Sequence, residues 1–457
     1  MNESLNQAIW NKYIAPTERK PGAFVGVEFE FPLLNLEKKP VCLPDVQNVV
    51  RDFAEQFGFS EQKADANDNL YSLTNPENGD NLSFDCSYNT LELSFGIEEN
   101  IHVLNKRFRT YFAFLQEHLK SAGHMLTGMG INPHHQYHTY DPIANDRYRM
   151  LHHHLHAYRN YGDVFYHDIP QFSMLAAASQ VQLDVQKEEI IPSIHAFNLL
   201  EPFKAVLFAN SYLDKLPERL LSRDYLWRYS SQGYNPHNLG MYETEIQNLD
   251  EYLAYVRSQS IYCVQKGEKY LHFKPIPLSE YLHLNTVTGT YFDGTAWQEF
   301  TFCPEAEDIA HHRSFKFADL TYRGTIEFRS ACEQPVRDVF THAAFHAGLA
   351  RKLPELTALL DSDSVLYHHG YNASELRELL TYRKLPAFIS QKQLSSQLLR
   401  ILELAEAGLS ERGFQEEIFL EPLFERAELL TNPAKNFLTG LEHGDSLETW
   451  IAYYAEL

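Results

Sequence analysis

Four short segments that lie far apart in the chain share one pattern, and this pattern constrains the fold more than any other feature. In each segment, apolar residues alternate with carboxylate or carboxamide residues, which is the period of a β-strand. The segments are residues 24–31, 91–95, 180–185 and 325–329, with polar faces that carry Gly26, Glu28 and Glu30; Glu92; Gln180, Gln182 and Asp184; and Thr325, Glu327 and Arg329.

These polar faces allow two interpretations. Each segment alone fits a half-exposed strand of an antiparallel sheet with its polar face in water. Glutamate is a poor strand former, however, and residues 26–30 contain two. If the strands are neighbours, the acids listed below crowd one concave face, where they cannot all ionise unless cations neutralise them. Oxygen ligands without cysteine suit Mg²⁺ or Mn²⁺ better than Zn²⁺, and such a face with arginines can clamp a triphosphate. The acids are Glu28, Glu30, Glu92 and Glu327.

The composition excludes several other classes of protein. The chain has 457 residues, with 39 Lys+Arg against 61 Asp+Glu, a formal charge of −22. This acidity argues against nucleic acid as a partner, because a phosphate backbone requires a basic surface. No apolar run approaches the roughly 18–20 residues that span a bilayer, and no signal peptide pattern opens the chain. We therefore expect a protein without a membrane partner, located in the cytoplasm.

Strand-period and helix-period segments interleave along the chain without a clean break. We expect helices at about residues 100–120 and 196–213, and a mostly helical C-terminal part from about residue 340, with a helix that stops at Gly413. The five cysteines are scattered without a CxxC motif, which supports neither a zinc ribbon nor a disulfide framework. The sequence predicts a single α+β domain over residues 1–457.

The order of these segments resembles that of the glutamate–cysteine ligases, most closely the plant and proteobacterial branch. No one motif is specific, but their shared order along nearly the whole chain is. The similar segments are Gly26–Glu30, for the GxExE opening; Asp85 with residues 91–94, for a second carboxylate pair; residues 179–184; Phe208–Ser211, followed by Arg223 and Trp227; residues 325–329; and residues 408–414 with 431–435.

The resemblance implies a fold and a reaction. The fold would be similar to the catalytic domain of glutamine synthetase, a curved and largely antiparallel sheet that forms a funnel with helices on its outer side. The reaction would join the γ-carboxylate of glutamate to the amine of cysteine with ATP, through γ-glutamyl phosphate, as the first step of glutathione synthesis. The expected partners are these small molecules, and the expected assembly is a monomer or a homodimer.

The resemblance also implies roles for individual residues. Arg329 would contact the ATP phosphates and, with Glu327, form the catalytic pair. An arginine fork fits a carboxylate bidentately, and the glutamate substrate would be bound by Arg147, Tyr148 and Arg223. The implied Mg²⁺ ligands are Glu28, Glu30, Asp85, Glu92, Gln180 and Glu327.

The sequence departs from the family pattern at three positions. Tyr212 stands where proline is usual, Asp85 replaces a glutamate, and Cys332 replaces an aspartate, either as a redox handle or as a packed small residue. The departures at Tyr212 and Cys332 motivate one alternative, a γ-glutamyl ligase for another amine. A non-catalytic nucleotide-binding relative and a metal-dependent hydrolase are further alternatives. The filled carboxylate positions argue against the non-catalytic alternative.

The histidines offer weaker signals. His152 and His156 are i,i+4 neighbours, as in a paired zinc site, but the glutamate of an HExxH motif is missing, so we expect a solvated or loop-packing role. His312 precedes the Glu327–Arg329 segment and could line the site. The numerous tyrosines and phenylalanines at helical spacing are expected in the core.

Overall fold

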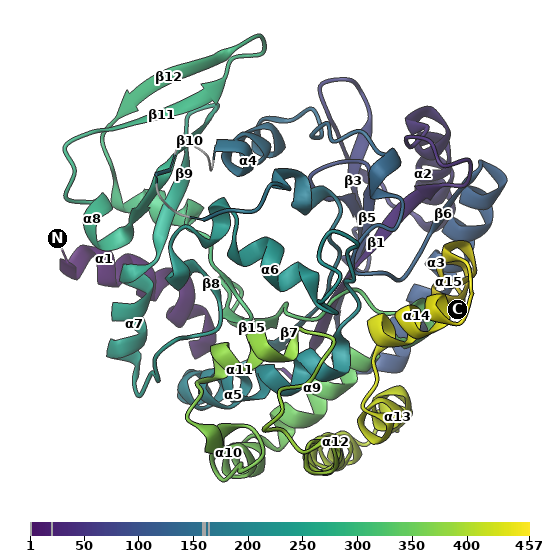
Figure 1. Cartoon of the computed structure of the whole chain (residues 1–457). Helices are drawn as coiled ribbons and strands as arrows, with labels where there is room; N and C mark the ends of the chain where they lie inside the picture. The colour runs from purple at the N-terminus through teal and green to yellow at the C-terminus, as the bar shows by residue number, and fades with distance from the viewer. Residues whose placement is uncertain (1, 20–21, 158–160, 163–164) are drawn as a thin grey trace.

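The computed structural model describes residues 2–19, 22–157, 161–162 and 165–457, in which a long antiparallel sheet is packed against helices (Figure 1). The sheet has nine strands in the order β14-β15-β7-β1-β5-β4-β3-β2, and β6 pairs with the far end of β1. The strands are β1 (Val25–Asn35), β2 (Glu61–Ala64), β3 (Leu70–Thr74), β4 (Asn81–Phe84), β5 (Thr90–Glu98), β6 (His124–Leu126), β7 (Ser179–Asp184), β14 (Ala318–Leu320) and β15 (Thr325–Phe328).

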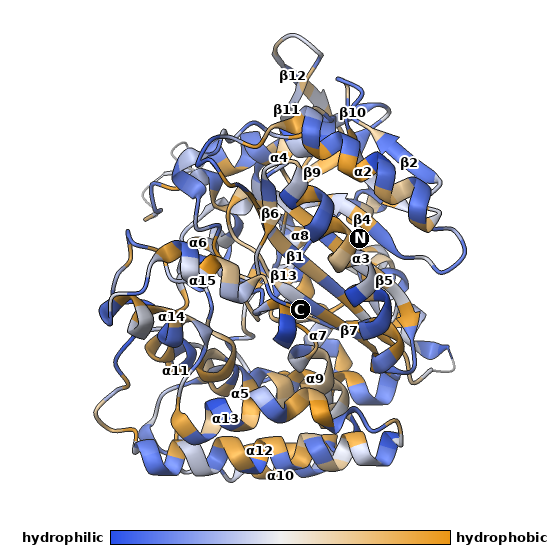
Figure 2. Cartoon of the chain, turned by 90° about the vertical axis from the view of Figure 1, so that its right-hand side faces the viewer, coloured by the Kyte–Doolittle hydropathy of each residue, from blue (hydrophilic) through white to orange (hydrophobic). Residues whose placement is uncertain are grey.

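The four segments with alternating polarity are all strands of this sheet, and they are consecutive neighbours. They form β15, β7, β1 and β5, and every pairing between them is antiparallel. The prediction of an α+β fold with a largely antiparallel sheet is therefore confirmed. Hydrophobic and hydrophilic residues alternate along the labelled strands β1, β5 and β7 (Figure 2).

The apolar face of the sheet is covered by three long helices. Phe29 of β1 is fully buried and its ring lies 5.5 Å from Phe108 of α3 and 5.1 Å from Phe340, just before α9. Phe328 of β15 lies 4.5 Å from Phe197 of α5. The first helices of the chain are α1 (Asn2–Ile9), α2 (Leu43–Phe57), α3 (Ile101–Ser121), α4 (Asp146–His156), α5 (Ile190–Phe208) and α6 (Ser222–Arg228). Burial of these aromatic side chains stabilises the fold by about 25 cal/mol per Å² of apolar area removed from water.

A second, four-stranded sheet projects beside the first at the upper left of Figure 1. Its order is β12-β11-β10-β9, and a short parallel pair joins β13 to β8. These elements are α7 (Leu249–Ser258), α8 (Leu278–Tyr281), β8 (Leu239–Gly240), β9 (Ser260–Lys266), β10 (Lys269–Pro277), β11 (Val287–Phe292), β12 (Trp297–Phe302) and β13 (Phe315–Lys316).

The C-terminal part is helical from Thr341 onwards. It contains α9 (Thr341–Arg351), α10 (Leu353–Asp361), α11 (Ala373–Leu380), α12 (Gln391–Arg412), α13 (Glu421–Leu429), α14 (Pro433–Glu442) and α15 (Leu447–Tyr454). Gly413 ends α12 in the left-handed region at φ 77°, which confirms the predicted helix stop. A hydrophobic cluster that includes Leu5 at one end of the chain and Ala455 at the other connects these helices to the sheet. Within the described residues, no helix is both long and apolar enough to cross a bilayer.

Candidate active site

The register of the sheet brings the predicted acidic residues onto one face. Glu30 of β1 is directly opposite Glu92 of β5, and Glu28 is opposite Gln180 of β7. On the next strand, Glu327 of β15 is opposite Gln182 of β7. Since side chains alternate along a strand, all of these point away from the apolar face that packs on the helices.

Glutamine amides lie between the carboxylates. Gln182 Nε2 donates to Glu28 Oε1 at 2.9 Å and to Glu327 Oε1 at 3.1 Å, and so connects β1 to β15. Gln180 Nε2 donates to Glu30 Oε1 at 3.0 Å, while the other oxygen of Glu30 accepts the backbone N–H of Ala178 at 2.7 Å. The two glutamines of β7 therefore hold the carboxylates of Glu28, Glu30 and Glu327.

The crowding changes the protonation of these acids. Burial, with the charge of Glu92 as the next cause, raises the pKa of Glu28 to about 8. Burial and the charge of Glu30 raise the pKa of Glu92 to about 8, and burial and Asp85 raise the pKa of Glu30 to about 7. Asp85, just after β4, has its pKa raised by burial, an effect that Arg147 opposes. Such groups hold protons at neutral pH unless a cation replaces them.

Two arginines face this acidic surface from the β7 and β15 side. Arg329 follows β15 directly, and its Nη1 donates to Glu327 Oε2 at 3.1 Å. Arg223 of α6 is 5% exposed, and its Nη1 donates to the backbone oxygen of Arg329 at 3.1 Å. The Nε of Arg223 is buried without a hydrogen-bond partner. A buried donor without a partner is costly, so this atom is suited to an acceptor that a ligand supplies.

Arg147 and Tyr148, on α4, lie at the other end of the acidic face, beside Asp85. The Arg147 guanidinium is 5.4 Å from the Tyr148 ring, and Tyr148 donates its hydroxyl to the backbone oxygen of Phe84 at 3.3 Å. Arg147 interacts with Asp85, whereas Arg223 interacts with Glu30. The structure thus places the three predicted glutamate-binding residues at both ends of the acidic face, and their role in binding substrate stays a prediction.

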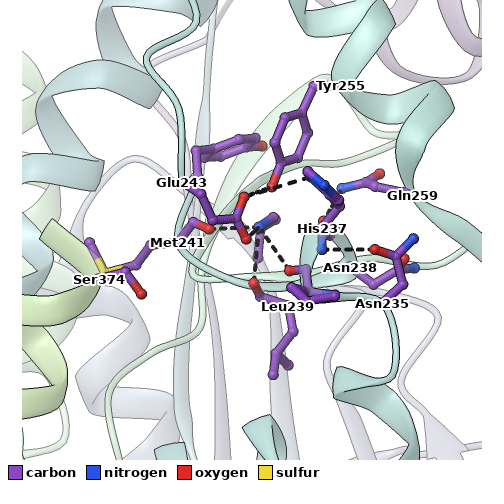
Figure 3. Close-up of polar contacts among 12 residues, drawn as sticks. Asn235, His237, Asn238, Leu239, Met241, Glu243, Tyr255, Gln259 and Ser374 are labelled. Atoms are coloured by element: carbon purple, nitrogen blue, oxygen red, sulfur yellow. Dashed lines mark hydrogen bonds and ion pairs between the residues drawn. The ribbon is translucent and has the colours of Figure 1, made fainter. Parts of the chain in front are cut away.

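A buried lysine fixes the segment beside Arg329. The ammonium of Lys316 is fully buried and donates to the backbone oxygens of Leu239 at 2.9 Å and Met241 at 2.6 Å. Glu243, which accepts the hydroxyl of Tyr255 at 2.5 Å, also lies 3.4 Å from this ammonium (Figure 3). Burial lowers the pKa of Lys316 to about 8.

This lysine anchors β13, and the following residue accepts a hydrogen bond from Arg329. The backbone N–H of Arg329 donates to Phe317 at 3.1 Å, and its guanidinium lies 5.4 Å from the ring of Phe315. The position of Arg329 therefore depends on a polar network well outside the acidic face.

Two further carboxyl groups at the site were missed by the sequence analysis. Asp319 of β14 is opposite Glu327, and burial raises its pKa to about 6. Glu333 is fully buried and accepts the backbone N–H of Glu30 at 3.0 Å. The period-2 position of Asp319, between buried Ala318 and Leu320, could have indicated the first; Glu333 follows β15 in a loop and has no such signal.

The metal prediction finds suitable donors but no ready-made centre. Among the described residues, no three His, Cys, Asp or Glu side chains are arranged to hold a metal ion. The acidic face nonetheless carries carboxylate and carboxamide oxygens, which are the ligands that Mg²⁺ prefers. A glutamine whose amide group rotates by half a turn presents its oxygen, in place of its nitrogen, to such an ion. The Mg²⁺ ligands therefore stay a prediction.

The histidine signals lie away from the acidic face, whereas Cys332 pairs with Ala178 beside it. His312 is buried and its Nδ1 lies 2.8 Å from the Tyr13 hydroxyl, so it packs beside the N-terminal segment. His152 and His156 contact each other on α4, with ring centroids 4.0 Å apart and planes tilted by 33°, and they belong to no metal-binding group within the described chain. Cys332 is fully buried, and burial raises its pKa, which favours a packed residue over a redox handle.

A family model described as Glutamate-cysteine ligase family 2 (GCS2) matches residues 24–446 of the chain. The chain belongs to this family. The match includes all of the acidic and arginine positions discussed above. The resemblance inferred from the order of the sequence motifs is thus confirmed at the level of the family.

Curated relatives within the family include plant enzymes. The chain is 26% identical over 275 residues to the chloroplastic glutamate–cysteine ligase of Nicotiana tabacum. The aligned part covers 58% of this chain and 49% of that protein. The chain is 25% identical over 275 residues to that of Solanum lycopersicum, with the same coverage. The aligned part spans about half the length of the curated relatives it matches.

Two solved structures are similar at low identity. A glutamate–cysteine ligase from Francisella tularensis in complex with AMP aligns at 12% identity and a TM-score of 0.49, covering 96% of this chain and 88% of that one. A bifunctional glutathione synthetase from Pasteurella multocida aligns at 11% identity and a TM-score of 0.46, covering 98% and 52%. The family assignment depends on the sequence match and not on these structures.

Proposed function

We propose that this chain is an ATP-dependent glutamate–cysteine ligase, which forms γ-glutamylcysteine in the first step of glutathione synthesis. The observation that carries the proposal is the single acidic face on which Glu28, Glu30, Glu92 and Glu327 meet Arg223 and Arg329. Membership of the glutamate–cysteine ligase family supports the choice of substrates.

The proposed reaction has two balanced steps. An oxygen of the substrate γ-carboxylate attacks the γ-phosphorus of ATP in line, which breaks the bond to the bridging oxygen and releases ADP. The cysteine amine then attacks the acyl phosphate carbon, phosphate leaves, and the amine loses a proton. Phosphorylation is needed because a carboxylate is a poor electrophile. The protein's contribution is positioning and charge neutralisation, as in other phosphoryl transfers.

In this proposal, each part of the site has one task. Arg329, fixed by Glu327 and by Phe317, binds a phosphate oxygen. Arg223 offers its unpaired Nε to the α-carboxylate of glutamate, where a charge-assisted hydrogen bond restores its missing partner.

The proposed Mg²⁺ ligands are those named from the sequence. Glu28, Glu30, Asp85, Glu92, Gln180 and Glu327 would hold Mg²⁺ or Mn²⁺, which would neutralise the phosphates next to these acids. The raised pKa values of Glu28 and Glu92 support this assignment, because a bound cation could replace the protons that they otherwise hold.

The test is an ADP-release assay with glutamate, ATP, Mg²⁺ and a panel of amines, with the product identified by mass spectrometry. We expect turnover to require glutamate, and the cysteine reaction to yield γ-glutamylcysteine. ATP binding without ADP release in the presence of every acceptor would instead indicate a non-catalytic relative. Turnover of a substrate without ATP would indicate a metal-dependent hydrolase.

A different acceptor amine is the second candidate, and the surroundings of Tyr212 motivate it. Tyr212 lines a cavity of about 300 Å³ together with Met129, Leu213 and Phe437. The amine panel separates the candidates: turnover with cysteine alone dismisses the alternative. A cytoplasmic location and a monomeric or dimeric state stay predictions.

A further inference from the structure

Arg377, on α11, is a buried arginine whose N–H groups all face partners. Its side chain is 3% exposed. Nε donates to Asp224 Oδ2 at 2.7 Å, and Nη2 donates to Asp224 Oδ1 at 3.2 Å. Nη1 donates to Glu201 Oε2 at 2.7 Å and to its backbone oxygen at 2.8 Å, and Nη2 reaches the backbone oxygen of Ser330 at 3.4 Å.

These partners are chain neighbours of the two arginines of the proposed site. Asp224 follows Arg223 on α6, and Ser330 follows Arg329. The guanidinium of Arg377 also lies 4.5 Å from the ring of Phe317, the residue that accepts the backbone N–H of Arg329. One side chain from the C-terminal helical part therefore contacts the segments of both arginines.

We propose that Arg377 is a positioning residue that holds α6 in the orientation where Arg223 can bind the carboxylate substrate. This inference rests on the proposed function. The contact to Asp224 is bidentate and charge-assisted, at 2.7 and 3.2 Å, whereas Ser330 offers one neutral acceptor at 3.4 Å, so the effect on Arg223 exceeds the effect on Arg329.

The charges around Arg377 explain why only an arginine serves here. Glu201 is fully buried and also accepts the ammonium of Lys204 at 2.7 Å and the hydroxyl of Ser330 at 3.1 Å. Two cations thus face two carboxylates, Glu201 and Asp224, in a closed network. A lysine at position 377 keeps the charge but not the planar fork, and cannot bridge both carboxylates as arginine does.

The experiment uses the full chain with the variants Arg377→Lys and Asp224→Asn and the double variant. We expect each single variant to raise the KM for glutamate by about tenfold or more, while the KM for ATP changes by less than about threefold. The double variant should be no worse than Asp224→Asn alone, because Arg377 acts through Asp224.

The matched control is Arg412→Lys. Arg412, the last residue of α12, also lies in the C-terminal part; its side chain is 6% exposed, and its Nε donates to Glu416 Oε2 at 2.7 Å. The Arg412→Lys variant should lower the melting temperature without changing the ratio of the KM for glutamate to the KM for ATP. An equal change of both KM values in Arg377→Lys, or the same ratio change in Arg412→Lys, overturns the inference.

A readout that is independent of activity separates this inference from the proposed function. Hydrogen exchange of the backbone amides of residues 222–228 should be faster in Arg377→Lys than in the wild type, and unchanged in Arg412→Lys. Unchanged exchange in Arg377→Lys contradicts the positioning role even if the enzyme is active. If exchange is faster in Arg377→Lys but the wild-type protein does not use glutamate, the positioning role of Arg377 still holds and the proposed substrate is wrong.

Discussion

Glu327 is the residue at which the acidic and the basic parts of the site meet. Its carboxylate accepts Gln182 through one oxygen and Arg329 through the other, both at 3.1 Å, and its side chain is 14% exposed. Substitutions at this position therefore test the site chemistry with little effect on the hydrophobic core.

We expect Glu327→Gln to reduce product formation by about 10²-fold or more, because the substitution removes a proposed Mg²⁺ ligand and the carboxylate that accepts a hydrogen bond from Arg329. The volume is nearly conserved and one member of a crowded acidic group is neutralised, so the melting temperature should stay equal or rise. The measurements are steady-state ADP release and thermal unfolding. Near-normal turnover, above all at low Mg²⁺, would count heavily against the assignment.

Arg223→Ala tests substrate binding at the same scale. We expect the KM for glutamate to rise far more than the KM for ATP, because the lost donors face the carboxylate substrate. The control is Arg228→Ala on the same helix, whose side chain is 41% exposed and donates to Glu378 and Ser374. Equal effects of Arg223→Ala on both substrates would contradict the assignment.

At the scale of elements, strands were predicted better than helix ends. All four polar strands occur where the alternation placed them, and the helix expected at 100–120 is α3. The helix expected at 196–213 is instead α5, Ile190–Phe208, which begins earlier and includes Pro202. It stops because Ala209 turns extended at ψ 122° and Ser211 forms a bridge with Leu221, a tertiary pairing that local periodicity does not contain.

The contact between α9 and α12 depends on two glycines. A Cβ at Gly408 of α12 would lie 1.9 Å from the backbone oxygen of Gly348, and a Cβ at Gly348 would lie 2.1 Å from that of Ala405. Since α9 is buried along most of its length and packs on β7 and β1, any displacement of α12 reaches the layer beneath the sheet.

We expect Gly408→Ala to lower the free energy of unfolding by about 1–3 kcal/mol, because the backbones must separate to admit the methyl group. Denaturant unfolding measures this loss. Glu406→Ala, at an exposed position of the same helix, is the control and should stay within about 0.5 kcal/mol of the wild type. A neutral Gly408→Ala would mean that the two helices are less closely packed than described.

At the scale of the whole molecule, the formal negative charge of the chain is reduced where carboxyl groups are buried together. The formal charge is −22, yet Glu28, Glu30 and Glu92 have pKa values of about 7 to 8. At these three carboxyl groups the folded state binds more protons than the unfolded state between about pH 5 and 8, so the stability that they contribute falls as pH rises through that window.

A divalent cation should reverse this trend. We expect Mg²⁺ to raise the melting temperature more at pH 8 than at pH 6, because at pH 6 it competes with protons on the same oxygens. At a hundredfold excess over its dissociation constant, the gain is about 2.7 kcal/mol. Thermal unfolding at both pH values, with and without Mg²⁺, measures the rise in melting temperature. In the double variant Glu28→Gln with Glu92→Gln, this rise should become similar at pH 6 and pH 8. The same Mg²⁺ shift at both pH values would argue against binding by these acids.

The sequence alone determined the alternating strands, their polar faces, and the family, because period-2 polarity and motif order are local properties of the chain. Alternation could mark Asp319 as a polar strand residue, but its place opposite Glu327 exists only through strand register, and Glu333 meets Glu30 only through a buried loop. The sequence could not reveal that glutamine amides join the acids or that Arg377 holds α6. Tertiary structure decided these points, because burial and the pairing of distant segments determine which charged side chains lie close together.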